Sequence, residues 1–193
     1  MKRLVFISLL LLGKTCFAQT PFATDDHGKY IQYEVVELKG TVKDSLTNRA
    51  MSFFKNLDKN DVRIQPSSSD SVINATGKFV ISRTSAMLSH PSEEVNYHFV
   101  AEIKNGKYRY WLTDFKFTPY QRDRYGVFVP VSGVTTPLEK SPGKLNAAVW
   151  KDYIKDASDQ AIKFGAKFKE QMASPLKTKS PEKSTAPIST GKW

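Results

Sequence analysis

The sequence has almost no cysteine. Cys16 is the single cysteine among 193 residues, so no disulfide can form within the chain. Small exported domains are often held together by disulfides, and a domain of this chain has to be stable through packing alone. Catalysis by a pair of thiols is excluded for the same reason.

Long apolar runs are also lacking. The N-terminal run extends only from Leu4 to Leu12, well short of the roughly 20 apolar residues that span a bilayer. Lys2 and Arg3 precede it and Ala18 follows it, which is the pattern of a secretory signal peptide. We therefore predict cleavage after Ala18, export to the periplasm or the extracellular space, and no transmembrane span. Lipid attachment at Cys16 is the alternative, which the lysine two residues before it disfavours.

Removal of residues 1–18 leaves a single predicted domain with two flanking segments. Residues 19–28 form a short leader, residues 29–171 the domain, and residues 172–193 a tail rich in Ser, Thr, Pro and Lys, whose low apolar content predicts disorder. The formal net charge falls from +10 to +7 without the signal peptide, and the tail carries +3 of that. The domain has no basic block of the kind that nucleic-acid binders show. A weak contact of the tail with an anionic surface is the partner that this charge suggests.

Groupings of catalytic or metal-binding residues are scarce as well. His27, His90 and His98 are far apart in sequence, and no serine or cysteine nucleophile accompanies them in a known motif. The cluster Asp25-Asp26-His27 has metal-ligand residue types, but it lies in the leader. A glycine-rich phosphate loop is absent. The sequence therefore indicates no catalytic residue, no metal and no cofactor, and an enzyme is not favoured.

The strongest positive signal is a β-hairpin over residues 95–117. Asn105-Gly106 suits a two-residue type I′ turn, and this turn sets the register from Lys104 opposite Lys107 to Phe99 opposite Leu112. Phe99, Ala101, Ile103, Tyr108, Tyr110 and Leu112 then share the core face. The other face carries Val100, Trp111 and an opposite-charge pair, Glu102 with Arg109, of the kind that stabilises a sheet.

Hydrophobic periodicity predicts the remaining elements. Strands are expected at 30–37, 62–65 and 71–83. The strand 30–37 would place Ile31, Tyr33 and Val35 on one face, and Gly77 would mark a bulge or bend in the strand 71–83. Residues 84–94 are expected to be a polar connection, and residues 118–143 a long one with four prolines.

Two helices complete the prediction. Thr41 or Asp44 would cap the first, in which Leu46, Ala50, Phe53 and Leu57 form one apolar stripe. The second would begin at Ser141-Pro142 and end before Pro175. Its stripe contains Ala147, Trp150, Ile154, Ala157, Ala161, Phe164 and Phe168. The fold class is therefore α+β, an antiparallel sheet in the order β-α-β-β-β-β-α with both helices packed on one face.

This order and several short motifs resemble a family of secreted bacterial proteins that is known only as a domain of unknown function with a TATA-binding-protein-like fold. The motifs are Tyr33-Glu-Val-Val36, the helix from Lys43 to Phe54, Gly77, and Lys104-Asn-Gly-Lys-Tyr-Arg-Tyr110 running into Thr113-Asp-Phe115. The resemblance covers roughly residues 29–170. It implies the fold and an exported location, and it carries no activity.

The open face of the predicted sheet is where we expect a functional site. Val36, Val80, Val100, Trp111 and Phe115 would form an apolar patch there among Gln32, Lys78 and Thr113, large enough to need a partner. Residues 125–131 could cover this patch or extend the sheet edge. Alternatively the patch binds a ligand, an envelope protein, a polysaccharide or a second copy. The candidate binding residues are Arg109, Trp111, Arg122, Arg124, Tyr125 and Phe128.

Two functions follow as hypotheses. The first is a non-enzymatic binding or scaffolding module of the bacterial envelope that uses this open face. The alternative is a hydrolase or transferase of envelope polymers with Asp114 as its acid–base group, because the hairpin register places Asp114 on the core face, where an unpaired carboxylate is costly. A bulge that rotates Asp114 outward would leave it a structural role. DNA binding by analogy with the fold is disfavoured by export, since fold does not imply function.

Overall fold

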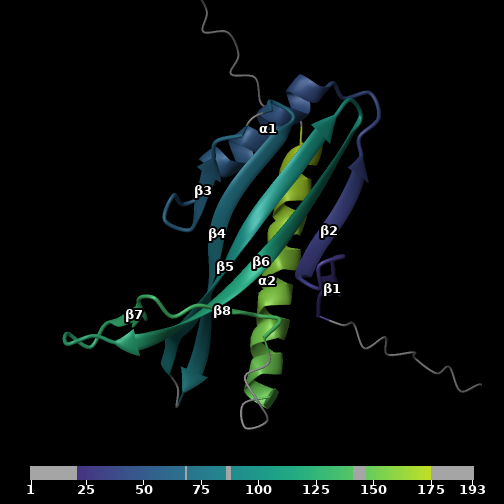
Figure 1. Cartoon of the computed structure of the whole chain (residues 1–193). Helices are drawn as coiled ribbons and strands as arrows, with labels where there is room; N and C mark the ends of the chain where they lie inside the picture. The colour runs from purple at the N-terminus through teal and green to yellow at the C-terminus, as the bar shows by residue number, and fades with distance from the viewer. Residues whose placement is uncertain (1–20, 68, 86–87, 141–146, 175–193) are drawn as a thin grey trace, which may run out of the picture.

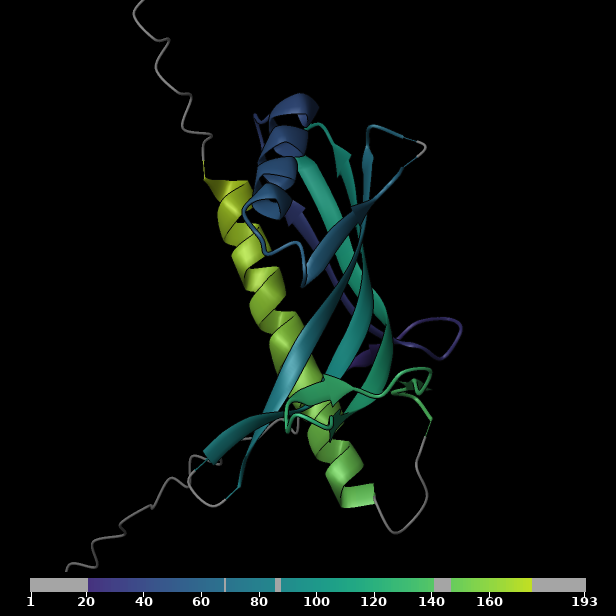
Figure 2. The same cartoon turned by 90° about the vertical axis from the view of Figure 1, so that its left-hand side faces the viewer.

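An antiparallel sheet packs against two helices on one of its faces. The computed structural model describes residues 21–67, 69–85, 88–140 and 147–174. The sheet order is β1-β2-β6-β5-β4-β3, and Figures 1 and 2 show both helices on the same side of it. The elements are β1 (Ala23–Thr24), β2 (Tyr30–Glu37), α1 (Lys43–Lys55), β3 (Val62–Gln65), β4 (Val72–Ser85), β5 (Leu88–Lys104), β6 (Lys107–Arg122), β7 (Phe128–Pro130), β8 (Thr136–Pro137) and α2 (Ala147–Ala173). The predicted order and the α+β class are confirmed.

The β5–β6 hairpin has the predicted register. Every pair from Lys104 with Lys107 to Phe99 with Leu112 is found, and the six residues of the predicted core face are at most 2% exposed. The type I′ turn is wrong, however. Gly106 has a φ of 73°, whereas Asn105 is not among the described non-glycine residues with positive φ, and a type I′ turn needs both residues there.

Asn105 serves the first helix instead. Its Oδ1 accepts a hydrogen bond of 2.8 Å from the backbone N–H of Lys43, the first residue of α1. Val42, at the N-cap position, makes no capping hydrogen bond through its side chain, so the predicted caps Thr41 and Asp44 are wrong. A hairpin turn therefore satisfies one of the free amides that every helix start presents.

Two predicted connections are in fact strand. Residues 88–94 belong to β5, which pairs with β4 from Leu88 opposite Ser85 to Glu102 opposite Val72. The register of the β4–β5 pair shifts between Ile81 and Ser82, with the extra residue on β5, and not at Gly77. Gly77 instead leaves space for the ring of Tyr97 on the neighbouring strand, because a Cβ there would collide with that ring.

The segment 118–140 extends the sheet. β6 continues to Arg122, and β7 and β8 both fold back to pair with β6. Leu138 is fully buried, and its carbonyl accepts a hydrogen bond of 3.0 Å from the indole N–H of Trp150 on α2. The prolines at 130 and 137 end β7 and β8, which fits the absence of a donor N–H in proline.

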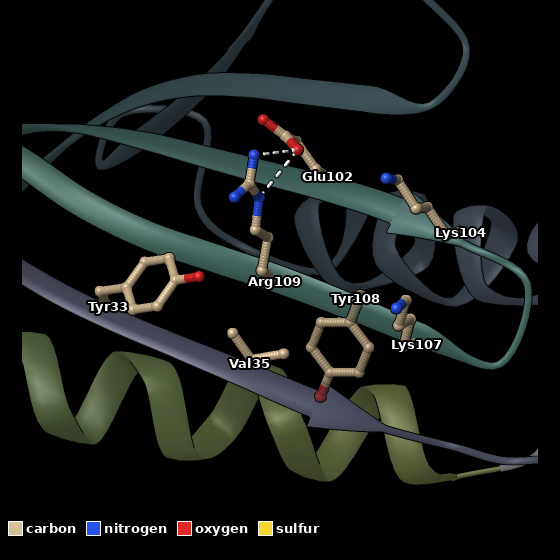
Figure 3. A pocket seen from close by; sticks show the side chains of 7 residues that line it. All are labelled: Tyr33, Val35, Glu102, Lys104, Lys107, Tyr108 and Arg109. Carbon is tan, nitrogen blue, oxygen red and sulfur yellow. Dashed lines mark hydrogen bonds and ion pairs between the residues drawn. The ribbon is translucent and has the colours of Figure 1, made fainter.

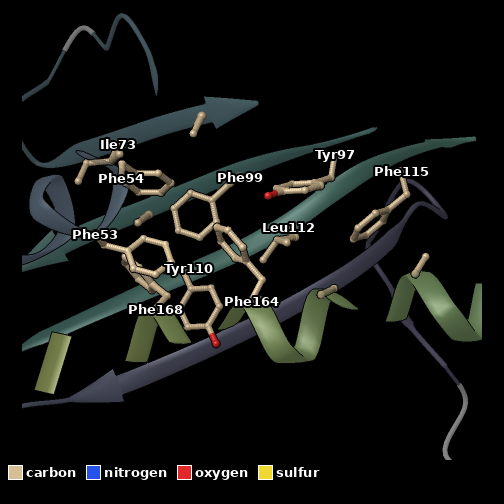
Figure 4. Packing of buried hydrophobic residues seen from close by; sticks show 14 of the residues in the cluster. Phe53, Phe54, Ile73, Tyr97, Phe99, Tyr110, Leu112, Phe115, Phe164 and Phe168 are labelled. Carbon is tan, nitrogen blue, oxygen red and sulfur yellow. The ribbon is translucent and has the colours of Figure 1, made fainter. Parts of the chain in front are cut away.

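An aromatic cluster joins the helices to the sheet (Figure 4). Phe168 of α2 is fully buried, and its ring centroid lies 5.2 Å from that of Phe99 and 5.3 Å from those of Phe53 and Tyr110. The interplanar angles are 70–74°, the edge-to-face geometry that aromatic pairs prefer. Phe53 brings α1 into the same cluster.

A polar link fastens α2 to the sheet beside this cluster. The hydroxyl of Tyr110 donates to Glu34 Oε2 at 2.6 Å, and Lys169 Nζ donates to Glu34 Oε1 at 2.6 Å. The hydroxyl of Tyr110 reaches Glu34 across Gly165, where a Cβ would collide with it. Partial burial by itself would raise the pKa of Glu34, but the hydrogen bonds from Lys169 and Tyr110 hold that pKa below its usual value.

The ordered domain is longer at both ends than the sequence predicted. Phe22, placed in the leader, is buried against Phe115 and Tyr30, with ring centroids 4.5 and 5.4 Å apart. Met172, placed in the tail, is a fully buried residue of α2. Ala147 was predicted to face the core and is exposed. The signal peptide, the helix start at 141–142 and most of the tail lie outside the described residues.

Candidate functional site

The sheet face opposite the helices carries a small aromatic and basic cluster. Tyr33 on β2 is the register partner of Trp111 on β6, and their ring centroids are 6.4 Å apart. The guanidinium carbon of Arg109 lies 5.6 Å from the centroid of the Trp111 ring, within cation–π range. Tyr33 is 47% exposed, so this cluster borders solvent. No helix covers this face in the part of the chain that Figures 1 and 2 draw as ribbon.

Glu102 holds Arg109 in place. Its Oε2 accepts hydrogen bonds from Arg109 Nε at 2.8 Å and from Nη2 at 2.6 Å, as Figure 3 shows. This is the predicted cross-strand pair, and it raises the pKa of Arg109 above its ordinary value. The pair is half exposed and contributes little to stability. Its effect is to fix where the guanidinium stands beside Trp111.

A hollow of about 270 Å³ opens next to this pair (Figure 3). Tyr33 and Val35 from β2 line one side. The remaining lining comes from the end of the hairpin, namely Glu102, Lys104, Lys107, Tyr108 and Arg109. Burial raises the pKa of Tyr108, so its hydroxyl stays protonated at neutral pH. The hollow thus combines exposed apolar surface with three cations and one carboxylate.

The predicted composition of the open face is partly wrong. Trp111 is there, and Val80 is 40% exposed, but Val100 is only 9% exposed. Val36 packs against the core, because its partner on β6 is the core residue Tyr108. Tyr33 and Val35, which share the other face of β2, stand on the open side at 47% and 52% exposure. They are the site residues that the sequence reasoning missed.

A bulge explains the other errors on β6. Asp114 has a φ of 57°, and the β5–β6 register shifts between Asn96 and His98. The extra residue changes the phase of the strand. Leu112 and Phe115 therefore both face the core, although they are three residues apart, and Phe115 is fully buried instead of lying on the open face.

The same bulge turns Asp114 away from the core. The core position assigned by regular alternation is therefore wrong, and the alternative of a bulge that rotates Asp114 outward is confirmed. Its carboxylate accepts hydrogen bonds from Lys116 Nζ at 2.6 Å and from Lys29 Nζ at 2.8 Å. These contacts with Lys116 and Lys29 hold the pKa of Asp114 below its usual range. An aspartate that stays ionised between two lysines does not supply a proton at neutral pH. The bond with Lys29 also ties the turn before β2 to the bulge.

The six predicted site residues fall into two groups. Arg109 and Trp111 form the cluster described above. The others occupy the distal end of β6 and the turn into β7, where Arg122 lies over the ring of Phe128 at 4.8 Å and Arg124 over that of Tyr125 at 5.0 Å. Trp111 and Arg122 are eleven positions apart along the strand, a path of about 36 Å at ~3.3 Å per residue. The structure does not bring the two groups into one site.

Two further features were not predicted. On the open side Glu94, 8% exposed, accepts a hydrogen bond of 3.1 Å from the hydroxyl of Tyr120 and pairs with Lys78 at 3.4 Å. Partial burial, together with Glu94, raises the pKa of Tyr120 to about 12.

A groove of about 930 Å³ runs between β2 and α2. Pro21 borders this groove, and the carbonyl of Pro21 accepts a hydrogen bond from the hydroxyl of Ser158 on α2.

The described residues contain neither a metal-binding cluster nor a helix suited to crossing a membrane. Within residues 21–67, 69–85, 88–140 and 147–174, no group of three or more His, Cys, Asp or Glu side chains is placed to hold a metal ion. None of the helices described for this chain is both long and apolar enough to cross a membrane.

Comparisons with known proteins confirm the resemblance predicted from the sequence. Residues 33–118 match a family model described as a domain of unknown function (DUF4468) with TBP-like fold. A DUF4468 family protein from Bacteroides ovatus is similar in structure, with a TM-score of 0.59 and 17% identity over 81% of this chain and 93% of that one. A TBP-like protein from Parabacteroides distasonis gives a TM-score of 0.60 and 12% identity over 80% and 99%. No curated protein matches the chain significantly.

Proposed function

Starting from a domain of unknown function with a TBP-like fold, we propose that this chain is an exported, non-enzymatic binding module of the bacterial cell envelope. The observation that carries the proposal is the contact of the exposed Tyr33 with the half-buried Trp111 beside Arg109, on a sheet face that neither helix covers. Exposed aromatic side chains with a fixed arginine are the residue types that dominate binding energy at interfaces.

The charged N-terminal start and short apolar run of residues 1–18 support the export part of this proposal. The binding part is supported by the rigidity of the cluster. β2, β6 and β5 are paired with one another through the region that carries it, and a site on paired strands keeps its geometry better than one on loops. The state of Asp114, ionised between Lys29 and Lys116, favours binding over acid–base catalysis.

Binding can be tested by co-sedimentation of residues 19–193 with washed bacterial envelopes. The double variant Tyr33→Ala/Trp111→Ala removes both rings of the cluster, and we expect most of this variant to stay in the supernatant. Ile162→Ala on α2, at a residue that is 47% exposed, is the matched control and should be retained like wild type. Equal retention of all three proteins would overturn the binding role, provided that circular dichroism shows each of them folded.

Export is tested separately. The full chain is expressed in a bacterial host with an affinity tag after Trp193, and the mass of the purified protein is measured from the periplasmic and cytosolic fractions. The proposal expects a periplasmic form that begins at Gln19. A cytosolic protein that keeps residues 1–18 would overturn the location and leave the binding experiment unaffected.

A further inference from the structure

Two lysines stand directly opposite each other at the end of the hairpin. Lys104 and Lys107 are register partners, both line the hollow, and like charges directly opposite one another destabilise a sheet. Neither lysine forms an ion pair in the described part of the structure. Such a pair stores an unfavourable interaction that an anion placed between the two ammonium groups would relieve.

The nearby acids form no ion pair with these two lysines in the described part of the structure. Glu102 is engaged by Arg109 at 2.6 Å. Glu37 on β2 is the register partner of Lys107, yet no ion pair joins these two described residues. The hollow is therefore lined by three cations and a single carboxylate that is already paired, so its charge is complementary to an anionic ligand.

The apolar part of the lining suits a ligand that contains a sugar ring. Tyr33 offers a half-exposed aromatic ring beside the 52% exposed Val35, a flat apolar surface against which the C–H face of a sugar ring can pack. A volume of about 270 Å³ lies just below the ~300–1,000 Å³ typical of pockets for drug-sized ligands, which fits one or two sugar rings. The hollow is open to solvent, so a polymer can continue beyond it.

An acidic peptide is the competing occupant, and the backbone disfavours it. Extended peptides gain much of their affinity by pairing with a free strand edge. Here β6, the middle strand under the hollow, is paired on both sides, with β2 and with β5, so a peptide lying over it would meet side chains there. A ligand that binds through ring stacking and charge fits this arrangement better than one that needs backbone partners.

We propose that the hollow binds an acidic polysaccharide, with a uronic-acid carboxylate between Lys104 and Lys107 and a neighbouring sugar ring of the same polymer against Tyr33. This proposal rests on the binding role of the open face and names its ligand class. The carboxylate takes charge-assisted hydrogen bonds from the two ammonium groups, while Glu102 keeps Arg109 oriented along the edge of the hollow.

The test is affinity electrophoresis of residues 19–193 in gels containing polygalacturonate, with neutral dextran as the uncharged polymer. We expect polygalacturonate alone to retard the protein. Lys104→Gln/Lys107→Gln and Tyr33→Ala should each weaken binding by about tenfold or more, as expected for the loss of one strong contact. The matched control Lys163→Gln/Lys167→Gln makes the same charge change at exposed positions of α2 and should bind like wild type.

Several results would overturn the ligand class. Equal losses in the two lysine double variants would mean general attraction to a basic protein. If Tyr33→Ala bound as well as wild type, the contact between the sugar ring and Tyr33 would be refuted. Tighter binding of poly-glutamate than of polygalacturonate in solution would indicate an acidic peptide as the ligand. No retardation at all, together with envelope retention that depends on Tyr33 and Trp111, would refute the polysaccharide and leave the binding role standing. If the envelopes retained the Tyr33→Ala/Trp111→Ala variant as well as wild type, the binding role itself would be refuted.

Discussion

The fit between Gly165 and Tyr110 gives the sharpest stability prediction. A Cβ at residue 165 would collide with the hydroxyl of Tyr110 and come within 3.1 Å of two of its ring carbons. Exchanging glycine for alanine inside a helix normally stabilises by about 0.8–1.0 kcal/mol. Overpacking of a core costs about 1–3 kcal/mol, and displacing the hydroxyl also weakens its bond to the Glu34 carboxylate. We expect Gly165→Ala to destabilise the domain by about 1–3 kcal/mol net.

A second variant isolates the collision. Tyr110→Phe removes the hydroxyl, and by itself should cost about 1.5–3 kcal/mol for the lost hydrogen bond to a charged group. In the Tyr110→Phe background, Gly165→Ala should be nearly neutral, because its main obstacle is gone and the helix-propensity gain remains. The coupling between the two substitutions should be about 1–3 kcal/mol. Ala166→Gly, at the exposed neighbouring position, measures helix propensity alone and should cost about 1 kcal/mol.

Urea unfolding followed by tryptophan fluorescence measures these free energies on residues 19–193. A change of 1 kcal/mol corresponds to a shift of about 2–4 °C in Tm for a domain of this size, so thermal unfolding provides an independent check. Additivity of the two substitutions, or a Gly165→Ala protein at least as stable as wild type, would show that Tyr110 does not depend on the gap at residue 165.

Two further stability predictions come from the polar contacts of the fold. Asn105→Ala removes the acceptor that caps α1 at Lys43 and should lower the free energy of unfolding in urea by about 1 kcal/mol. Asn105→Asp keeps an acceptor and should leave this free energy nearly unchanged. Equal losses in the two variants would argue against the cap. The depressed pKa of Glu34 means that its contribution is present above its ordinary pKa of 4.5 and is lost as the pH falls through the lower folded-state value. Glu34→Gln should therefore reduce the loss of stability in acid. The measurement is Tm between pH 6 and 3, roughly the window in which carboxylates titrate. If Tm falls with pH as steeply in Glu34→Gln as in wild type, Glu34 is not the group responsible.

The predictions that succeeded depended on short-range chemistry. The Asn-Gly turn determined which residues of β5 and β6 oppose each other, and the core face of that hairpin followed from alternation alone. The apolar stripes of both helices were recognisable for the same reason, since residues three and four apart share a helix face. Gly77 was predicted to mark a bulge or bend in β4, which is wrong, because the space that it leaves for Tyr97 depends on a neighbouring strand.

The predictions that failed each needed a distant partner. Asn105 was expected to adopt a positive φ in a type I′ turn. In the structure it does not, and its side chain caps α1 instead. Residues 88–94 have a polar composition and a proline, and β4 nevertheless pairs with them. The alternation of β2 defined two faces without indicating which one packs against the helices, so Tyr33 and Val35 were placed together but their exposure was not known.

The sequence by itself determined the element order, the hairpin register, the family resemblance and the pairing of Glu102 with Arg109, because each depends on residues close together in the chain or on a turn that aligns them. The tertiary structure alone decided the candidate site. The pairing of β2 with β6 brought Tyr33 and Val35 to Trp111 and the hairpin lysines, and the bulge at Asp114 removed both Phe115 and the carboxylate from the positions that regular alternation assigned to them. Strand pairing across the sheet, which no local pattern encodes, is the physical reason that the sequence predicted Arg109 and Trp111 but not the β2 side of the site.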